Sequence, residues 1–304
     1  MNKLSQLIFL LVVTMTSYGQ NTSKWFNKNE TERIEKFLSS DALEGRKVYS
    51  KGIEMAANFI ANEFKQNGLK TWAKSETYLQ SFSRLNVKFI SAVGNFDGTP
   101  IDTKNIIVVT AQEKLEINET SGYEVVKINK EDNLMNSVRK CMTSGKNYLV
   151  VIDESFAQNF GRLVQLKSNI NENQKSLIFV LSNNTPIKFN IEATHQIEKL
   201  SLANVVGVIP GKSLPNEYVI FSGHYDHLGV NGKRAVNGDS IYNGANDDAA
   251  GTTAMIMLSK YFAALGNNER TIIFAAFTAE EAGGFGAQYF SKQFDPLQVC
   301  LLYT

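Results

Sequence analysis

Three short clusters of histidine and carboxylate side chains lie in the last third of the sequence. They span Gly223–His227, Asn243–Gly251 and Ala279–Glu281. Imidazole nitrogens and carboxylate oxygens are the ligands that zinc takes in catalytic sites, where the metal lowers the pKa of a bound water to near neutrality. The chemistry that these residue types offer together is hydrolysis by a metal-activated water.

The spacing within the first two clusters indicates which residues could bind a metal and which could support a ligand. His224 and Asp226 are two residues apart, so in a continuing strand both side chains leave on the same face. A metal-bound imidazole usually gives its other N–H to a carboxylate, and Asp226 is placed to accept it. Asp247 and Asp248 stand at the entrance to a predicted helix, where capping explains one acid but not two. The small residues around the pair allow the close approach that a carboxylate bridging two cations requires.

The third cluster places Glu280 and Glu281 just past a buried strand, which is a costly position for two acids unless a cation compensates their charge. One of them can coordinate a metal while the other faces the substrate water. Two other histidines are interpreted differently. We expect His227, in the loop past Asp226, to point from a different part of the edge, and His195, among polar residues, to be a solvated surface side chain.

The elements around these clusters alternate between strands and helices. Apolar runs predict strands over Tyr218–Ser222 and Thr271–Phe277, and helices are expected over Thr252–Leu265 and Phe285–Phe294. This order predicts an α/β fold with a mixed, mostly parallel sheet flanked by helices. Because ligands bind at the carboxyl ends of the strands in such sheets, the three clusters are expected to converge at one edge.

The earlier part of the chain divides into two regions. Apolar residues at helical spacing predict amphipathic helices over Thr31–Leu38 and Gly52–Asn67. From Leu85 to Leu200 short β-rich runs are separated by asparagine- and lysine-rich turns, which indicates an inserted accessory region. The predicted organisation is thus residues 20–84 and 201–304 as the metal-binding domain, interrupted by residues 85–200. Strands are expected in the insertion at Ile106–Val109, Tyr148–Ile152 and Leu177–Leu181.

Composition restricts the partners and the location. The 304 residues hold 31 basic and 30 acidic side chains, a balance that gives no reason to expect nucleic acid or an anionic membrane as partner. Lys3, the apolar run Leu7–Met15 and the small residues before Gln20 predict a signal peptide over residues 1–19, and hence a secreted or periplasmic protein. Only Cys141 and Cys300 are present, and we expect two buried thiols.

The three clusters together resemble the motifs of the co-catalytic di-zinc aminopeptidases of peptidase clan MH, a superfamily that also includes the glutaminyl cyclases. The resemblance covers roughly residues 30–82 and 204–304. It implies a zinc-dependent aminopeptidase with two zinc ions and peptide substrates. Carried over position by position, the resemblance implies that His224 is the terminal ligand of one zinc, that Asp247 bridges both, and that Glu281 is the terminal ligand of the second. It also implies that Asp226 orients the histidine and that Glu280 is the general base.

The sequence also departs from the pattern of that family, which supplies a further acid at the end of the next strand and a final histidine downstream. Here Val299–Tyr303 is interpreted as the beginning of that strand, and the sequence stops at Thr304. The expectation is therefore a catalytic sheet truncated at its C-terminus and lacking two metal ligands. Two alternatives stay open at this point: an inactive fragment or binding module of the same fold, and a glutaminyl cyclase.

Overall fold

The structure is a computed structural model, and it describes residues 24–235, 237–295 and 299–301. The predicted signal peptide therefore lies outside the described residues. The chain divides into two compact units. The first unit runs up to Gln80 and resumes at Ala203, and the second unit spans Ser81–Leu202. The chain passes between the units within two long strands, β2 (Leu79–Phe96) and β9 (Phe189–Ile209).

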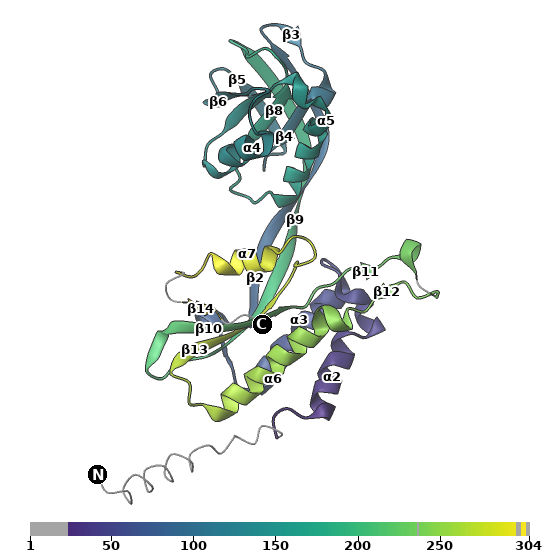
Figure 1. The fold of residues 1–304 in the computed structure, drawn as a ribbon, viewed down its shortest axis with the longest axis vertical. Coiled ribbons are helices and arrows are strands. Elements are labelled where there is room, and N and C mark those ends of the chain that lie inside the picture. The colour runs from purple at the N-terminus through teal and green to yellow at the C-terminus, as the bar shows by residue number, and fades with distance from the viewer. Residues whose placement is uncertain (1–23, 236, 296–298, 302–304) are drawn as a thin grey trace, which may run out of the picture. The chain divides into compact units, whose positions relative to one another are not determined.

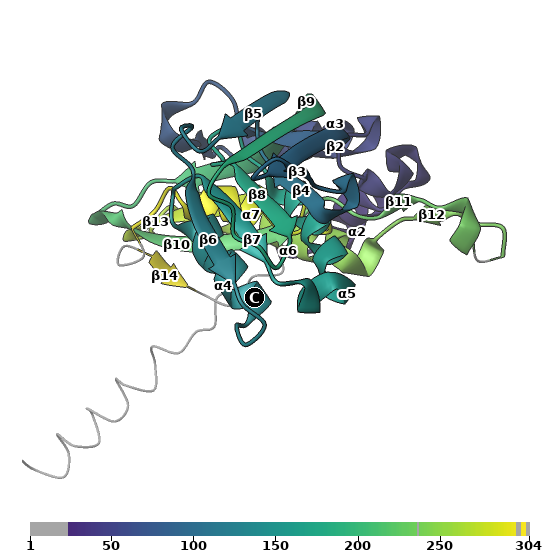
Figure 2. The ribbon, with the colours of Figure 1, turned by 90° about the horizontal axis from the view of Figure 1, so that it is seen from above.

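The first unit combines a sheet with helices on both of its faces. Its elements are α2 (Lys28–Leu38), η1 (Asp41–Arg46), α3 (Lys51–Gln66), β1 (Lys70–Thr71), η2 (Trp72–Lys74), β10 (Leu214–His224), β11 (Gly229–Val230), η6 (Gly232–Arg234), β12 (Ile241–Tyr242), η7 (Ala245–Ala249), α6 (Ala250–Leu265), β13 (Arg270–Phe277), α7 (Phe285–Ser291) and β14 (Val299–Leu301). Figures 1 and 2 show α2, α3 and α6 beside the sheet, and β11 and β12 as a ribbon that extends away from it.

Strand β13 lies at the centre of this sheet and is buried on both faces, as its continuous apolar sequence predicts. Ile272, Phe274 and Ala276 pack against α2, α3 and α6, whereas Ile273 and Ala275 pack with Phe290 of α7. This alternation of side chains produces two cores, one on each side of the strand. The sheet with helices on both faces confirms the predicted α/β class.

The sheet of the first unit is mixed rather than mostly parallel. Strand β10 is parallel to both β13 and β14, but β13 is antiparallel to β9, and β9 is antiparallel to β1. Strand β9 returns from the second unit and is not joined to β10 or β13 by a helix. The rule that strands joined by a helix run parallel was applied to the segments after Tyr218 and does not cover β9. The two parallel neighbours, β10 and β13, are the ones that end in the predicted site clusters.

The second unit has its own four-stranded sheet, ordered β4-β8-β7-β6. Its elements are β3 (Thr99–Pro100), η3 (Thr103–Asn105), β4 (Ile106–Val109), β5 (Lys114–Asn118), β6 (Glu124–Ile128), α4 (Leu134–Thr143), β7 (Tyr148–Ile152), η4 (Glu154–Phe156), α5 (Ala157–Phe160), η5 (Gly161–Asn169) and β8 (Leu177–Leu181). Strands β6, β7 and β8 are parallel, and β4 is antiparallel to β8. The three strands predicted here, at β4, β7 and β8, are confirmed.

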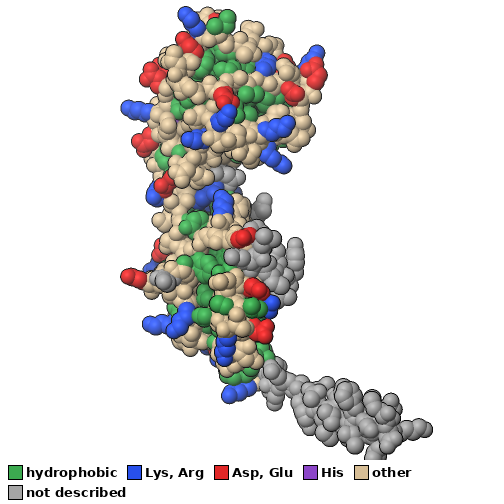
Figure 3. Space-filling model, turned by 90° about the vertical axis from the view of Figure 1, so that its left-hand side faces the viewer, with side chains coloured by type: hydrophobic (Ala, Val, Ile, Leu, Met, Phe, Trp, Pro, Cys, Tyr) green, Lys and Arg blue, Asp and Glu red, His purple; other side chains and the backbone are tan. Residues whose placement is uncertain are grey.

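The charged side chains of the surface are mixed in sign. On the face shown in Figure 3, basic and acidic side chains are interspersed, in keeping with the nearly equal numbers of the two signs.

Among the described helices, none has the length and apolar character that a membrane span requires. Cys141 is a buried free thiol, as predicted, and the side chain of Cys300 lies outside the described part of the structure.

Candidate metal centre

The parallel pairing of β10 and β13 brings two of the predicted clusters to one edge of the sheet. His224, the last residue of β10, is paired with Phe277, the last residue of β13. The pairing continues one step further, because the Tyr225 N–H donates to the Phe277 carbonyl at 2.9 Å. The segments that follow His224 and Phe277 therefore leave the sheet side by side.

Asp226 joins these two segments through its side chain. The carboxylate is fully buried, and its two oxygens accept the backbone N–H groups of Glu280 at 2.9 Å and Glu281 at 3.2 Å. A buried carboxylate that accepts two N–H groups is well satisfied. Asp226 thus fixes the backbone that carries both glutamates, a task that the sequence did not predict for it.

The predicted contact between Asp226 and His224 is made mainly through the main chain. His224 Nδ1 lies 3.2 Å from the Asp226 carbonyl oxygen and 3.7 Å from its Oδ1, so the carbonyl is the hydrogen-bond partner and the carboxylate acts at longer range. Burial disfavours the charged imidazole, but Asp226, Asp248 and Glu280 outweigh it and raise the pKa of His224 to about 9. The same negative field favours a metal cation at this position.

The aspartate pair divides into one structural and one outward-facing carboxylate. Asp248 accepts the His224 N–H at 2.9 Å and the Gly251 N–H at 3.0 Å, so it ties the turn η7 to the end of β10. A Cβ at Gly223 or Gly251 would lie within 2.9 Å of the Asp248 side chain, which explains the small residues around the pair. Asp247 is 64% exposed, and its Oδ1 lies 3.0 Å from His224 Nε2.

The glutamate pair also points in two directions. Ala279 has a positive φ of 56°, and this turn at the end of β13 presents both glutamates at the edge of the sheet. Glu280 is 53% exposed, with Oε2 4.0 Å from His224 Nε2, whereas Glu281 is less exposed and its Oε1 lies 2.8 Å from His227 Nδ1. The two acids are therefore near different histidines.

The position expected for His227 was wrong. Its imidazole is 9% exposed and does not point from a different part of the edge. One ligand atom from each of His227, Asp247 and Glu281 lies within 4.8 Å of the others. His227 Nδ1 lies 2.8 Å from the Glu281 oxygen, but the approach does not have hydrogen-bond geometry, so this buried nitrogen has no hydrogen-bond partner among the described residues. A second imidazole therefore belongs to the cluster.

The donor set fits zinc. His224 and His227 offer imidazole nitrogens, and Asp247 and Glu281 offer carboxylate oxygens, which are the ligand types of catalytic zinc sites. A buried Nδ1 of His227 without a hydrogen-bond partner is costly, and a bound cation would offset that cost. Asp247 is the member that contacts His224 and also belongs to the group with His227 and Glu281.

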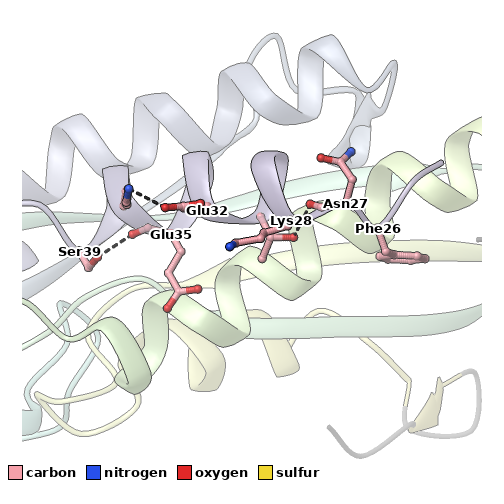
Figure 4. A pocket seen from close by; sticks show the side chains of 8 residues that line it. Phe26, Asn27, Lys28, Glu32, Glu35 and Ser39 are labelled. Atoms are coloured by element: carbon pink, nitrogen blue, oxygen red, sulfur yellow. Dashed lines mark hydrogen bonds and ion pairs between the residues drawn. The ribbon is translucent and has the colours of Figure 1, made fainter. Parts of the chain in front are cut away.

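A small pocket adjoins the cluster, whereas two larger hollows lie elsewhere. The small pocket has a volume of about 210 Å³ and is lined by Phe221, Ser222, Asp248, Gly251, Ala254, Met255 and Leu258. A hollow of about 460 Å³ runs along α2 (Figure 4), and another of about 550 Å³ lies in the second unit. Neither of the larger hollows contains a predicted site residue.

The histidine of the second unit is not a surface residue, so that expectation was wrong. His195 is 3% exposed and lies in β9, with its ring 6.0 Å from that of Phe89. The buried amine of Lys167 lies 4.7 Å from the centre of the same Phe89 ring. Burial and the positive charge of Lys167 lower the pKa of His195. The described residues include no carboxylate cluster around His195 of the kind that surrounds His224 and His227.

The fold and this geometry define the first unit as an α/β domain with a candidate metal site at the carboxyl ends of two parallel strands. Residues 204–302 match the model of Peptidase family M28. These residues include all five predicted site positions and His227. The predicted resemblance to the zinc aminopeptidases is thereby confirmed for this part of the chain.

Curated relatives match a similar length of this chain. A probable zinc metalloprotease of Pyrenophora teres f. teres (strain 0-1) is 30% identical over 118 residues, which cover 39% of this chain and 24% of the relative. Aminopeptidase NAALADL1 of Rattus norvegicus is 29% identical over 109 residues, covering 34% of this chain and 13% of the relative. The chain thus matches a quarter or less of the length of these two relatives.

Solved structures with a similar chain course include the aminopeptidase from Aneurinibacillus sp. strain AM-1. It is 14% identical, with a TM-score of 0.47, and the match covers 91% of this chain and 68% of that one. A glutaminyl cyclase from Bacteroides thetaiotaomicron is 12% identical, with a TM-score of 0.41, and the match covers 90% and 59% of the two chains.

Proposed function

We propose that the protein is a zinc-dependent aminopeptidase that hydrolyses N-terminal peptide bonds. The observation that carries the proposal is the meeting of two histidines and three outward-facing acids at one sheet edge, in a segment that matches a metallopeptidase family. Asp226 and Asp248, the other two acids, have their oxygens occupied by backbone N–H groups. The remaining acids are free to serve a cation and a substrate.

In this proposal His224, Asp247 and Glu281 would hold zinc, Asp247 would serve both ions if two are bound, and His227 would supply a further nitrogen. Bound zinc lowers the pKa of a water molecule and polarises the scissile carbonyl. Glu280, the acid near His224 that is about half exposed, would accept a proton from the attacking water at its carboxylate and deliver it to the leaving amine.

Asp226 is assigned a supporting task in this reaction. Since it accepts hydrogen bonds from the N–H groups of both Glu280 and Glu281, it fixes the positions of the proton acceptor and a metal ligand relative to each other. A displacement of either carboxylate by about 1 Å would misplace it for reaction, because reacting groups need near-attack geometry.

The experiment that tests the proposal measures zinc per chain by elemental analysis, together with hydrolysis of aminoacyl-anilides and short peptides. Bound zinc and release of the N-terminal amino acid would support an aminopeptidase. A cyclised product from an N-terminal glutamine would assign glutaminyl cyclase activity instead. A folded chain that takes up no zinc from micromolar solution and releases no product would contradict the proposal.

We also propose that the protein is exported, as a secreted or periplasmic enzyme. Support comes from the sequence alone, through Lys3, the apolar run Leu7–Met15 and the small residues before Gln20. Expression of the full chain, followed by cell fractionation and N-terminal sequencing, should recover outside the cytoplasm a chain that begins near Gln20. Recovery of the intact N-terminus in the cytoplasm would contradict export.

A further inference from the structure

Arg46, at the end of η1, is buried to a degree that is unusual for an arginine. Its side chain is 1% exposed, and its guanidinium donates to four backbone carbonyl oxygens. Nε donates to Tyr225 at 2.8 Å, Nη1 donates to Leu38 and, at 2.6 Å, to Asn243, and Nη2 donates to Gly244 at 2.9 Å. A guanidinium has five N–H groups in a fixed fork, so most of its donors are used.

The carbonyls that accept these hydrogen bonds belong to the segments that carry the metal-centre residues. Tyr225 stands between His224 and Asp226, and the Asn243–Gly244 pair leads into η7, which carries Asp247. The main chain of Arg46 adds a further connection, since the His227 N–H donates to the Arg46 carbonyl at 3.1 Å. One residue from the N-terminal part of the chain therefore connects the loop after β10 to the loop before α6.

Two glycines allow the close packing around Arg46: Gly244 leaves room for the guanidinium, and Gly45 lets the chain beside Arg46 approach β11 and β12. A Cβ on Gly244 would lie 2.7 Å from Arg46 Nη2, and a Cβ on Gly45 would lie 2.6 Å from the carbonyl oxygens of Gly229 and Tyr242. Both glycines also have positive φ, 61° and 67°, which other residues adopt less readily. The close fit indicates that the loop before α6 is packed against this side chain.

The charge of Arg46 has a second effect on the site. Burial lowers the pKa of Arg46, whereas the nearby carboxylates of Asp226, Asp248 and Asp247 favour its charged form. These acids share one sheet edge with Glu280 and Glu281, and their mutual repulsion destabilises the folded loops. A buried cation next to three of them offsets part of that repulsion.

We propose that Arg46 is the positioning residue of the metal centre: it holds the loop of His224, Asp226 and His227 against the loop of Asp247 at the spacing that a cation requires. The part of this inference that concerns zinc rests on the proposed function, whereas the part that concerns the two loops does not. Removal of Arg46 should therefore loosen two named segments and weaken metal binding together.

The experiment compares Arg46→Lys and Arg46→Met with Arg33→Met as a matched control. Arg33, in α2, forms ion pairs with Glu30 and Glu63, and neither of these acids belongs to either loop. Hydrogen exchange is followed by mass spectrometry in segments 224–230 and 243–250, with α3 as the internal reference. Zinc affinity is measured by competition with a chelator.

Both Arg46 variants should exchange faster than the wild type in segments 224–230 and 243–250 while α3 stays protected. Their zinc affinity should fall by about 10- to 100-fold, the loss typical when a group that orients metal ligands is removed. Lysine keeps the charge but cannot reproduce a fork of four hydrogen bonds, so Arg46→Lys should show both effects. Arg33→Met should show neither effect.

Three results would overturn the inference. The first is wild-type exchange in both segments in folded Arg46→Met. The second is wild-type zinc affinity and loop protection in Arg46→Lys, which would leave charge alone as the role. The third is faster exchange throughout the first unit, or failure of both variants to fold, which would make Arg46 a general stabiliser. If the wild-type chain binds no zinc, the proposed function fails, but the exchange pattern still decides the role of Arg46 in holding the loops.

Discussion

Both units place polar residues directly after buried parallel strands, but the residues of the second unit serve the turns that leave its sheet. Asp153 follows β7 and accepts the Ser155 N–H at 2.9 Å. Asn183, two residues after β8, accepts the Glu154 N–H at 3.1 Å. Short polar side chains that satisfy backbone N–H groups in this way complete a turn or a helix start.

The strand ends of the first unit contain such residues and others besides. Asp226 and Asp248 accept backbone N–H groups, as Asp153 does, but Asp247 lies against His224, and Glu281 lies against His227. The difference teaches that an acid at a strand end is not by itself a sign of a site. The sign is an acid whose oxygens face other ionisable side chains after the local turns have been satisfied.

The largest effect is expected from Asp247→Asn, because this carboxylate is shared by both groups of candidate ligands. The variant should lose its bound zinc and, with it, all turnover, whereas Asp153→Asn in the second unit should keep the zinc content of the wild type. Elemental analysis of the purified chains measures both. If Asp247→Asn kept its full zinc content, Asp247 would not be needed for zinc binding and would not differ in this respect from Asp153.

Glu280→Gln should separate turnover from metal binding within the first unit. Loss of the proton acceptor should lower kcat by about 10²- to 10⁴-fold, the usual contribution of a general base, while zinc stays bound. Aminoacyl-anilide hydrolysis and zinc content are measured on the same sample. If zinc disappears together with activity, Glu280 is a ligand and its assignment here is wrong.

The two buried histidines allow a direct comparison between the units. His227→Gln should weaken zinc binding by about 10- to 100-fold, and it should change the visible absorption of the cobalt-loaded chain, because one nitrogen is removed from the metal environment. His195→Gln should leave both properties unchanged. An identical cobalt spectrum in His227→Gln and wild type would exclude His227 as a ligand.

A smaller effect is expected from an acid that has basic partners, Glu30 on α2. Hydrogen bonding to Arg33 and to Lys260 lowers its pKa from 4.5 to about 2. Because the folded pKa is below the unfolded one, the stabilisation is present above about pH 4.5 and is lost as the pH falls toward 2. Glu30→Gln should lower the free energy of unfolding by no more than about 1 kcal/mol at pH 7.

Thermal melts of Glu30→Gln and wild type at pH 7 and pH 2 test this expectation. The difference in Tm should shrink at pH 2, and zinc content should not change at pH 7. If the difference in Tm grew on acidification, the predicted pH dependence of the stabilisation by Glu30 would be wrong.

Several features could be predicted from sequence because they follow from local pattern. The continuous apolar runs gave the bounds of β4, β7 and β8 correctly, and the alternation of strands and helices after Tyr218 indicated the shared edge. His195 was misjudged, although a signal was present. Phe189, Ile191, Ala193 and His195 form the buried face of β9, at the two-residue period of a strand.

Other features have no local signal. The Arg46 hydrogen bonds to Tyr225, Asn243 and Gly244 span 179, 197 and 198 residues of sequence, and Arg46 itself has a positive φ of 49°. The approach of His227 to Glu281 depends on how two loops are folded back by Arg46 and Asp226. Such contacts arise from tertiary packing, which neither spacing nor hydrophobic period encodes.

The passage of the chain through β2 and β9 has a consequence for synthesis on the ribosome. Residues 81–202 are contiguous and have their own core, so this unit can fold as soon as it emerges. The helices α2 and α3 emerge earlier, but their partners in β13 and α6 come after the whole second unit. The apolar faces of the first helices must therefore wait until α6 and β13 have been synthesised, and in that interval they are the segments that chaperones would be expected to bind.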